Sequence, residues 1–330
     1  MNQPRVNRPL TVAVVGVGEM GHNHARCLAS MKGVDLVGVV DTDFDKSTQV
    51  ASMYECRPLR SIQELPRVDA AVISVPSALH AEVGCELMAR GVHCLVEKPL
   101  ALDREQAELL VATADSAEVV LQVGHIERFN PAVRQLKALV EDGVVLVANA
   151  RRMSAVSGRV TDIDVVMDLM VHDLDIVLYL MGGQIAGVDA RAIQGPNGTD
   201  HATALLSFLD GRLASLTASR ITQNQIRQLE VTTKDRFFAV DYPNQELLIY
   251  RQGRIEGVEG GDSTGGRYAL DVETRRVFVR RTEPLLAELQ HFVDAVMGIH
   301  ECEVDGHGAL RALDLVWRIQ ALLEDSDHGS

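Results

Sequence analysis

A run of apolar and β-branched residues near the start of the chain leads directly into a glycine-rich turn. The run covers 10–15 and continues as Gly16-Val17-Gly18-Glu19-Met20-Gly21, after which apolar residues keep helical spacing. A buried strand, a GxGxxG turn and a helix together predict a dinucleotide-binding unit. Gly16 permits the tight turn, Gly18 lets the backbone approach a pyrophosphate at the helix N-terminus, and Gly21 allows close helix–strand packing.

The second predicted strand, 34–40, ends at Asp41. A carboxylate about 20 residues after the glycine turn is placed to bind the adenosine ribose hydroxyls of NAD. It disfavours the 2′-phosphate of NADP, and the residues after Asp41 include no arginine to hold that phosphate. The sequence therefore predicts NAD as the cofactor. A helix N-cap is the alternative role of Asp41.

Strand and helix patterns then alternate as far as residue 124. Strands are predicted at 70–75, 92–96 and 119–123, and helices at 79–90 and after Asp103. This alternation is typical of an α/β fold with a doubly wound parallel sheet, and it predicts a Rossmann domain over 1–124. Ligands of such sheets bind at the carboxyl edge of the strands.

The strand at 92–96 ends in Glu97-Lys98-Pro99, at the edge where a nicotinamide ring is expected. Pro99 disfavours helical dihedrals at Lys98 and keeps the turn extended. A lysine here can hydrogen-bond a substrate hydroxyl, and a neighbouring cationic nicotinamide is expected to favour its neutral form. The alternative is a solvated Lys98 paired with Glu97.

The overall composition limits the possible partners. The chain has 330 residues, enough for two domains, and 46% are hydrophobic, enough for a sizeable core. A formal net charge of −14 argues against sequence-independent nucleic-acid binding, although local arginines can still bind an anionic small molecule. The five cysteines are scattered, and no apolar run reaches the roughly 18 residues of a membrane span. We therefore expect a cytoplasmic protein with reduced cysteines and without nucleic-acid or membrane partners.

From residue 125 the pattern changes. Strands with intervening turns dominate 187–281, and Asp210-Gly211 marks a hairpin between two apolar runs. This predicts a second, α+β domain over 125–330 with a large, mainly antiparallel sheet. The glycine-rich stretch 252–266 is expected to be a loop.

Five basic residues of the second half are candidates for substrate binding. His125 and Arg128 follow the last predicted strand of the first domain, so they can reach the cofactor edge. Arg151, Arg152 and Arg159 gather within a short stretch of an acidic chain. Guanidinium groups suit phosphate, so this cluster indicates an anionic group on the substrate. The alternatives are a structural histidine at 125 and a solvated basic surface.

Asp168 and His172 lie four residues apart in a predicted helix. This spacing puts both on one helix face, and a histidine oriented by a carboxylate can act as a general base near neutral pH. A polar surface pair is the alternative. No third ligand is indicated, so we do not expect a metal ion.

Three stretches resemble the glucose–fructose oxidoreductase and inositol dehydrogenase family, Gfo/Idh/MocA: GVGEMGHNHARCL, VPSALHAEVGCELMARGVHCLVEKPLA and VGHIERFNP. The resemblance implies NAD-linked oxidation of a secondary alcohol on a sugar, and a homodimer or homotetramer formed through the open face of the second sheet. It implies that Lys98 is catalytic. The family pattern D-x-G-x-H-x-x-D is matched at Asp168, His172 and Asp175, with Met170 in place of glycine, which adds Asp168 and His172 to the catalytic set. Either His172 or Lys98 takes the hydroxyl proton.

By the same resemblance, 76–80 lines the cofactor and Glu97 faces its nicotinamide side. The predicted cofactor-contacting residues are Gly16, Gly18, Glu19, Met20, Gly21, Asp41, Ser74, Pro76, His80, Glu97 and Lys98. The predicted substrate-contacting residues are His125, Arg128, Arg151, Arg152, Arg159 and His172.

Within the family, VGHIERFNPAV together with the later arginines and the Asp168–Asp175 motif is similar to the UDP-N-acetylglucosamine 3-dehydrogenase subgroup. This similarity implies a UDP-sugar substrate whose 3-hydroxyl becomes a ketone, with Arg151, Arg152 and Arg159 on the diphosphate. Ala155-Val156 replaces the Pro-Phe pair usual there. The alternatives are an inositol or free-sugar dehydrogenase, which needs no arginine cluster, and a non-catalytic NAD-binding sensor.

Overall fold

The structure, a computed structural model, describes residues 8–140, 144–155, 163–195, 198–252 and 272–327. The chain divides into two compact units, 1–129 with 282–315 and 130–281 with 316–330. Residues 282–315, which the sequence division assigned to the second domain, lie in the first unit. None of the described helices is both long and apolar enough to cross a membrane.

The first unit is built around a six-stranded sheet. Its strands are β1 (Leu10–Val15), β2 (Val34–Val40), β3 (Arg57–Leu59), β4 (Ala70–Ile73), β5 (His93–Glu97) and β6 (Leu121–Gly124). They lie in the order β3-β2-β1-β4-β5-β6, and every neighbouring pair is parallel. This is the strand order of a Rossmann sheet, so the predicted doubly wound parallel sheet is confirmed.

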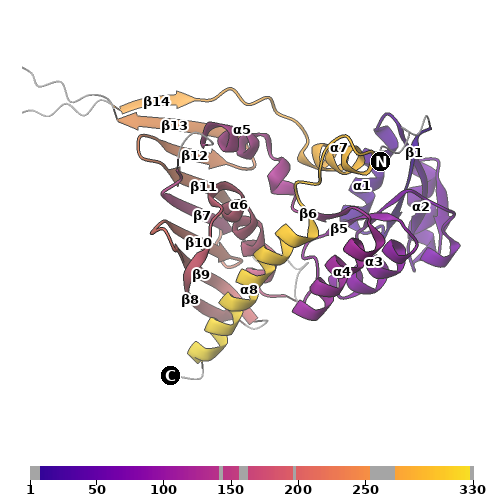
Figure 1. The fold of residues 1–330 in the computed structure, drawn as a ribbon, viewed down its shortest axis with the longest axis horizontal. Helices are drawn as coiled ribbons and strands as arrows, with labels where there is room; N and C mark the ends of the chain where they lie inside the picture. The colour runs from indigo at the N-terminus through magenta and orange to yellow at the C-terminus, as the bar shows by residue number, and fades with distance from the viewer. Residues whose placement is uncertain (1–7, 141–143, 156–162, 196–197, 253–271, 328–330) are drawn as a thin grey trace, which may run out of the picture. The chain divides into compact units, whose positions relative to one another are not determined.

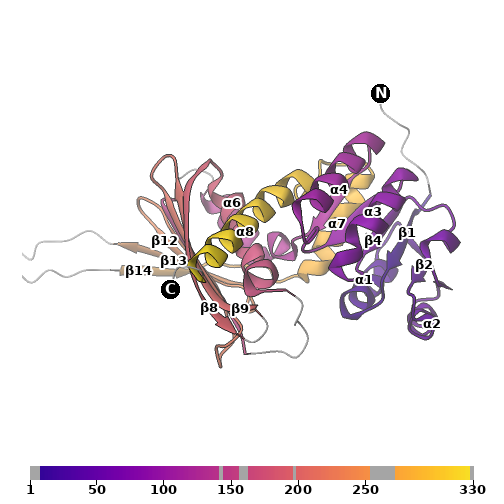
Figure 2. The ribbon, with the colours of Figure 1, turned by 90° about the horizontal axis from the view of Figure 1, so that it is seen from below.

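Helices cover both faces of this sheet. They are α1 (Glu19–Ser30), α2 (Phe44–Met53), α3 (His80–Ala89), α4 (Arg104–Ala117) and α7 (Pro284–Val296), with short 3₁₀ turns η1 (Ile62–Glu64), η2 (Ser77–Leu79) and η3 (Ile126–Phe129). Figure 2 shows α1 and α2 on one side of the strands and α3 and α4 on the other. Helix α7 packs on α1, where Leu285, Leu289 and Phe292 join the core formed by the strands and α1.

The second unit is built around an eight-stranded sheet. Its strands are β7 (Val147–Met153), β8 (Ile185–Gly195), β9 (Gly198–Phe208), β10 (Leu213–Ser219), β11 (Ile226–Thr232), β12 (Phe237–Asp241), β13 (Glu246–Gln252) and β14 (Val272–Arg276). The order is β14-β13-β12-β11-β7-β10-β9-β8, and only the β7–β10 pair is parallel. The predicted, mainly antiparallel sheet is confirmed. The predicted hairpin joins β9 to β10, with Gly211 at a φ of 84° in the turn.

Helices cover one face of the second sheet. They are α5 (Pro131–Val140), the π-helical turn η4 (Val166–Met170), α6 (Val171–Met181) and α8 (Gly306–Asp327), of which α8 begins in the first unit. Helix α5 contacts β12 and β13, and α6 contacts β7 and β10 (Figure 1). Among the described residues of this unit, no helix lies on the other face (Figure 2). The predicted loop at 252–266 lies outside the described residues, apart from Gln252.

Candidate active site

The glycine turn after β1 packs backbone against backbone. Gly16 has a φ of 87°, and a Cβ atom built on it would lie 2.5 Å from the carbonyl oxygen of Ser74. A Cβ atom on Gly21 would lie 1.8 Å from the carbonyl oxygen of Gly16. Any side chain at Gly16 or Gly21 therefore collides with backbone, which explains the requirement for glycine at both positions.

The environment of Gly18, the middle glycine of the turn, is different. A Cβ atom on Gly18 meets nothing within 4 Å, so the space beside this residue is open. Gly18 is also the N-cap of α1, and no side chain caps the helix there. Glu19 and Met20 lie in the first turn that follows this cap. This is the arrangement in which a helix N-terminus receives a phosphate.

Asp41 ties the end of β2 to the glycine turn. Its Oδ2 accepts a hydrogen bond from the Val17 amide at 2.9 Å, and its Oδ1 accepts one from the Asp43 amide at 2.9 Å. The N-cap of α2 is Asp43, whose carboxylate accepts from the Lys46 amide. The helix-cap alternative for Asp41 is therefore wrong. A carboxylate oxygen can accept more than one hydrogen bond, so Asp41 keeps acceptor capacity for ribose hydroxyls.

The segment after β4 is tied to the segment after β5 through His80. The ring is 1% exposed, with Nδ1 at 2.9 Å from the Pro99 carbonyl and Nε2 at 3.0 Å from the Val75 carbonyl. Burial lowers the pKa of His80, and a neutral imidazole donates to only one of these carbonyls. Ser74 and Pro76 lie on the same segment, between β4 and η2. His80 thus shapes the cofactor edge through the two backbones that it joins, and its ring is not exposed there.

Glu97 is held by a histidine of α1. Its Oε1 lies 2.6 Å from Nε2 of His24, a residue that is fully buried. A Cβ atom on Gly124, its partner on β6, would lie 3.0 Å from Glu97 Oε2, so a glycine at that position leaves room for the carboxylate. Lys98 follows, half-buried, at the carboxyl end of β5. The acid and the base predicted for this edge are therefore both at the strand end.

Sequence reasoning missed two buried groups of this unit, His24 and Glu288. His24 follows Gly21 by three residues, so it faces the sheet on the first turns of α1. Glu288 lies on α7 and is fully buried. Burial raises the pKa of Glu288 well above its ordinary value, and the nearby Glu97 carboxylate adds to the rise.

His125 and Arg128 also belong to the first unit. They lie directly after β6, where the His125 amide donates to the Val123 carbonyl and the Arg128 amide donates to the His125 carbonyl. Both side chains are largely buried, His125 at 2% exposure and Arg128 at 9%. The structure therefore places them in the turn that ends the nucleotide-binding sheet, as the sequence predicts.

Asp168 and His172 lie on one continuous helical stretch of the second unit. Asp168 is in the π-helical turn η4 and His172 is in the first turn of α6. Asp164 starts the stretch by accepting from the Val166 and Met167 amides, each at 2.9 Å. Both candidate side chains are half-buried, whereas the neighbouring Asp173 is buried. Short π-helical turns occur often at functional sites, which agrees with the predicted role of this stretch.

The predicted arginine cluster is divided by the sheet. Successive strand residues point to opposite faces, so Arg151 and Arg152 of β7 do as well. Arg152 is buried and donates from Nε and Nη2 to the two carboxylate oxygens of Asp173, at 3.0 and 2.9 Å. Arg151 donates to Gln228 at 2.9 Å and to Glu230 at 3.3 Å on β11. The two guanidinium groups cannot bind one ligand together, and Arg159 lies outside the described residues.

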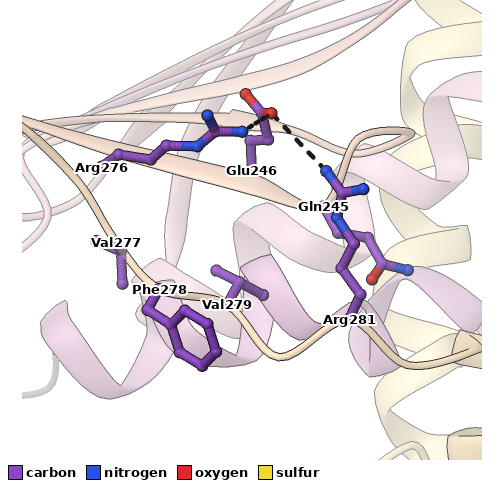
Figure 3. A pocket seen from close by; sticks show the side chains of 7 residues that line it. All are labelled: Gln245, Glu246, Arg276, Val277, Phe278, Val279 and Arg281. Atoms are coloured by element: carbon purple, nitrogen blue, oxygen red, sulfur yellow. Dashed lines mark hydrogen bonds and ion pairs between the residues drawn. The ribbon is translucent and has the colours of Figure 1, made fainter.

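A surface hollow of the second unit contains none of the predicted site residues. It is lined by Gln245, Glu246, Arg276, Val277, Phe278, Val279 and Arg281 (Figure 3). Arg276 and Arg281 both form ion pairs with the carboxylate of Glu246. The single Glu246 carboxylate thus counters one of the two positive charges, and none of the residues predicted to bind substrate lines the hollow.

The described part of the chain offers neither a metal-binding cluster nor a reactive thiol among Cys27 and Cys56. There, no group of three or more His, Cys, Asp or Glu side chains is placed to hold a metal ion. The five cysteines are free thiols. Burial raises the pKa of Cys27 and of Cys56 to about 11, which keeps both thiols protonated and unreactive at neutral pH.

Comparison with known proteins identifies the family. A model of the oxidoreductase family with an NAD-binding Rossmann fold matches residues 10–125, and a model of the GFO/IDH/MocA C-terminal domain matches residues 152–236. UDP-N-acetylglucosamine 3-dehydrogenase of Acidithiobacillus ferrooxidans is 33% identical over 321 residues, which cover 96% of this chain and 97% of that protein. The chain belongs to the GFO/IDH/MocA oxidoreductase family. It is an oxidoreductase with NAD as cofactor.

Solved structures and other relatives share the architecture. The structure of the A. ferrooxidans dehydrogenase matches with a TM-score of 0.86 at 32% identity, covering 96% of this chain and 98% of the other. The scyllo-inositol 2-dehydrogenase (NAD(+)) of Bacillus subtilis is 26% identical over 86% of this chain and 85% of its own length. Because these relatives are named for different substrates, family membership alone does not select one.

The first unit fits the cofactor of this family. The space beside Gly18 leads to the N-terminus of α1, where no side chain acts as a cap. Asp41 lies at the end of β2 with acceptor capacity, on the side where the adenosine ribose of a dinucleotide binds. Glu97 and Lys98 lie at the end of β5, on the other side of the strand-order reversal between β1 and β4. These groups would hold the two halves of NAD.

Proposed function

We propose that this enzyme oxidises the 3-hydroxyl group of UDP-N-acetylglucosamine to a ketone. The observation that carries the proposal is the 33% identity to a UDP-N-acetylglucosamine 3-dehydrogenase over 96% of this chain. The presence of Lys98, Asp168 and His172 at the family's catalytic positions supports an active enzyme over an NAD-binding sensor.

The proton of the substrate hydroxyl goes to Lys98 or to His172. Lys98 is half-buried at the end of β5, and a lysine in its neutral form accepts a proton. His172 lies one helical turn after Asp168, and an imidazole oriented by a carboxylate accepts a proton near neutral pH. As the proton leaves, charge develops on the oxygen and the carbon-bound hydrogen departs as hydride. NAD, when bound, is the hydride acceptor.

The diphosphate of the substrate requires cationic partners. Arg152 is already paired with Asp173, and Arg151 lies on the opposite face of the sheet from Arg152. We therefore assign diphosphate recognition to Arg128 and Arg159, with His125 as a further donor. Arg151 and Arg152 have no substrate role in this proposal.

The assembly that we propose is a homodimer or a homotetramer formed through the second sheet. In the described part of the second unit, one face of this sheet carries α5 and α6, and the opposite face carries no helix (Figure 2). Light scattering on the purified protein tests the proposal. A monomer at every concentration would contradict it.

A substrate panel decides between the candidate reactions. The protein is incubated with NAD and, separately, with UDP-sugars, free sugars and inositols, while the absorbance of NADH is followed. Turnover of UDP-N-acetylglucosamine and no other substrate class is the expected result. Turnover of an inositol alone would assign the function named for the B. subtilis relative instead. NAD binding without turnover of any of these compounds would favour a sensor.

A lysine substitution tests the catalytic assignment. Lys98→Ala is expected to lower kcat by about a hundredfold or more, because a positioned acid–base group contributes that much. NAD affinity is expected to change little. Lys46→Ala is the matched control, since Lys46 is an exposed residue paired with Asp43 on the first turn of α2. A Lys98→Ala variant as active as the control would remove Lys98 from the catalytic set.

A further inference from the structure

Glu288 lies where an apolar residue is expected. Leu285, Leu289 and Phe292 form the buried stripe of α7, and Glu288 lies within that stripe. Its side chain is 0% exposed, and neither carboxylate oxygen has a hydrogen-bond partner among the described residues. An ionised carboxylate without a partner is too costly to bury, so this side chain is in its neutral, protonated form.

The charged group that acts on Glu288 is Glu97. Burial raises the pKa of Glu288 well above its ordinary value, and the charge of Glu97 raises it further. The two carboxyl groups therefore interact, and this interaction and burial both favour the protonated form of Glu288. Glu97 itself accepts a hydrogen bond from Nε2 of His24 at 2.6 Å. Whatever changes the charge beside Glu97 changes the proton affinity of Glu288.

The elements that pack on α7 carry the other ionisable groups of this region. Helix α1 contributes His24, Arg26 and Cys27, and the segment after β6 contributes His125, Glu127 and Arg128. Helix α7 contributes His291, with Glu283 at its N-cap. Among the described residues, no hydrogen bond joins any of these groups to the Glu288 carboxyl.

Glu97 lies on the side of the sheet edge where the nicotinamide half of NAD would bind. Asp41 at β2 would bind the adenosine ribose and the α1 N-terminus would bind the pyrophosphate, which would leave β4 and β5 for the other half of NAD. Glu97 ends β5. The nicotinamide ring carries a positive charge when oxidised and none when reduced, so the two forms of the cofactor differ by one charge at this end of the site.

We propose that Glu288 is a positioning residue that exchanges a proton with solvent according to the oxidation state of the cofactor, acting through Glu97. When the oxidised cofactor binds, its positive charge favours two carboxylates, and Glu288 releases its proton to solvent. When the reduced cofactor binds, that charge is absent and Glu288 keeps the proton. This role rests on NAD as cofactor and does not depend on which sugar is oxidised, so it would hold even if the proposed substrate were wrong.

Binding calorimetry without any sugar tests the proposal. NAD⁺ and NADH are titrated into the whole protein in buffers of different ionisation enthalpy, which gives the number of protons released with each. The wild type is expected to release more protons with NAD⁺ than with NADH, by up to about one proton per site. Its affinity for NAD⁺ relative to NADH is then expected to rise with pH, by up to about tenfold per pH unit.

Three variants identify the group that exchanges the proton. Glu288→Gln keeps the shape of the side chain without a titrating proton, and it is expected to abolish the difference between the two cofactors. Glu283→Gln, at the N-cap of the same helix, is the matched control and is expected to keep the difference. A Glu288→Gln variant that keeps the full difference overturns the proposal. A second result also overturns it: His24→Gln loses the difference in proton release between NAD⁺ and NADH, while Glu288→Gln keeps it. That result assigns the proton to the His24–Glu97 pair.

An infrared measurement on the wild-type protein avoids any dependence on how the variants fold. The carbonyl stretch of a protonated carboxyl group is distinct from that of a carboxylate. We expect the protonated band in the free protein and in the NADH complex, and its loss in the NAD⁺ complex. The same band in all three states contradicts the proposal.

Discussion

Each unit buries a carboxyl group beneath a helix, and the two units stabilise it in opposite ways. Asp173 of α6, 2% exposed, receives two hydrogen bonds from the guanidinium group of Arg152, which is itself 4% exposed. Glu288 of α7, 0% exposed, receives none from the described residues. The first carboxyl group is therefore buried as a charge within an ion pair, and the second is buried as a neutral acid.

This difference separates a structural group from one that responds to a ligand. A carboxylate held by a bidentate arginine keeps its charge over a wide pH range, so it can join α6 to β7 under all ordinary conditions. A carboxyl group held neutral only by burial and by a neighbouring charge loses its proton when that charge is countered. The Asp173 pair therefore belongs to the core of the second unit, and Glu288 is the group that we propose to respond to the cofactor.

Removal of the cation at the buried ion pair is expected to have the largest effect on stability. Arg152→Met removes the guanidinium group that pairs with the buried Asp173 carboxylate, which costs about 3–5 kcal/mol. Urea unfolding that is followed by a probe in the second unit measures the loss. The double variant Arg152→Met with Asp173→Leu is expected to recover most of it, because an apolar pair of similar volume replaces both charges. No recovery would mean that the pair has a role other than charge compensation.

Substitution of the neutral acid, Glu288, is expected to change stability in the opposite direction and make the protein more stable. The folded-state pKa of Glu288 is raised, so above about pH 4.5 the unfolded chain loses a proton that the folded protein keeps. Stability falls with rising pH as a result, by up to about 1.4 kcal/mol per pH unit until the folded-state pKa is reached. Glu288→Gln removes this cost, and we expect it to be more stable than the wild type by about 3 kcal/mol at pH 7 and nearly equal to it at pH 4.

Urea unfolding of both proteins from about pH 4 to pH 8 provides the measurement for this variant. The informative quantity is the slope of the stability difference with pH. A constant difference would show that the Glu288 carboxyl is ionised in the folded protein, and the contrast with Asp173 would then be lost.

Much of the fold was predictable because its signals are local. The β-branched runs at 10–15 and 34–40 match β1 and β2 to the residue, since short apolar runs bounded by turns are typical of buried parallel strands. The partner of α7 was not predictable. The stripe of Leu285, Leu289 and Phe292 shows that the helix packs on something, but its partner α1 lies more than 250 residues earlier in the chain.

In the candidate site, too, the features set by local sequence were predictable and those set by distant contacts were not. The roles of Gly16, Gly18 and Gly21 follow from one turn, and a sequence pattern contains that turn completely. The partner of Arg152 is Asp173 on a different element, so local spacing could only suggest a cluster with Arg151. Alternation along β7 already implied opposite faces for the two arginines, although which face carries α6 is a property of the packed unit.

A half-exposed carboxylate of the first unit provides an intermediate case. Asp69 receives a bidentate pair from Arg8, with both distances 2.8 Å, and two further hydrogen bonds from Thr11. The Arg8 guanidinium is the main group that lowers the pKa of Asp69, to about 2. Asp69→Asn is expected to cost about 1 kcal/mol at neutral pH, a small value because solvent screens the half-exposed arginine.

The pH dependence of this variant runs opposite to that of Glu288→Gln. A lowered folded-state pKa gives stability that is present above the unfolded pKa near 4 and is lost as the pH falls toward 2. The deficit of Asp69→Asn in urea unfolding is therefore expected to shrink between about pH 5 and pH 3. A deficit that is the same at both values would assign it to the Thr11 hydrogen bonds and not to the charge.

The smallest effect is expected at the ion pair that joins the N-cap of α7 to α1. Glu283 and Arg26 are ion-paired with side chains 42% and 45% exposed, so water competes for both groups and salt screens them. Glu283→Gln is expected to leave the urea midpoint within measurement error, at low and at high salt. Helix α7 is then held by its apolar stripe and not by this charge. The contrary result would be a salt-sensitive loss of stability as large as that of Asp69→Asn. It would mean that burial does not determine how much each carboxylate contributes to stability, and the predicted order of effects from Asp173 down to Glu283 would be wrong.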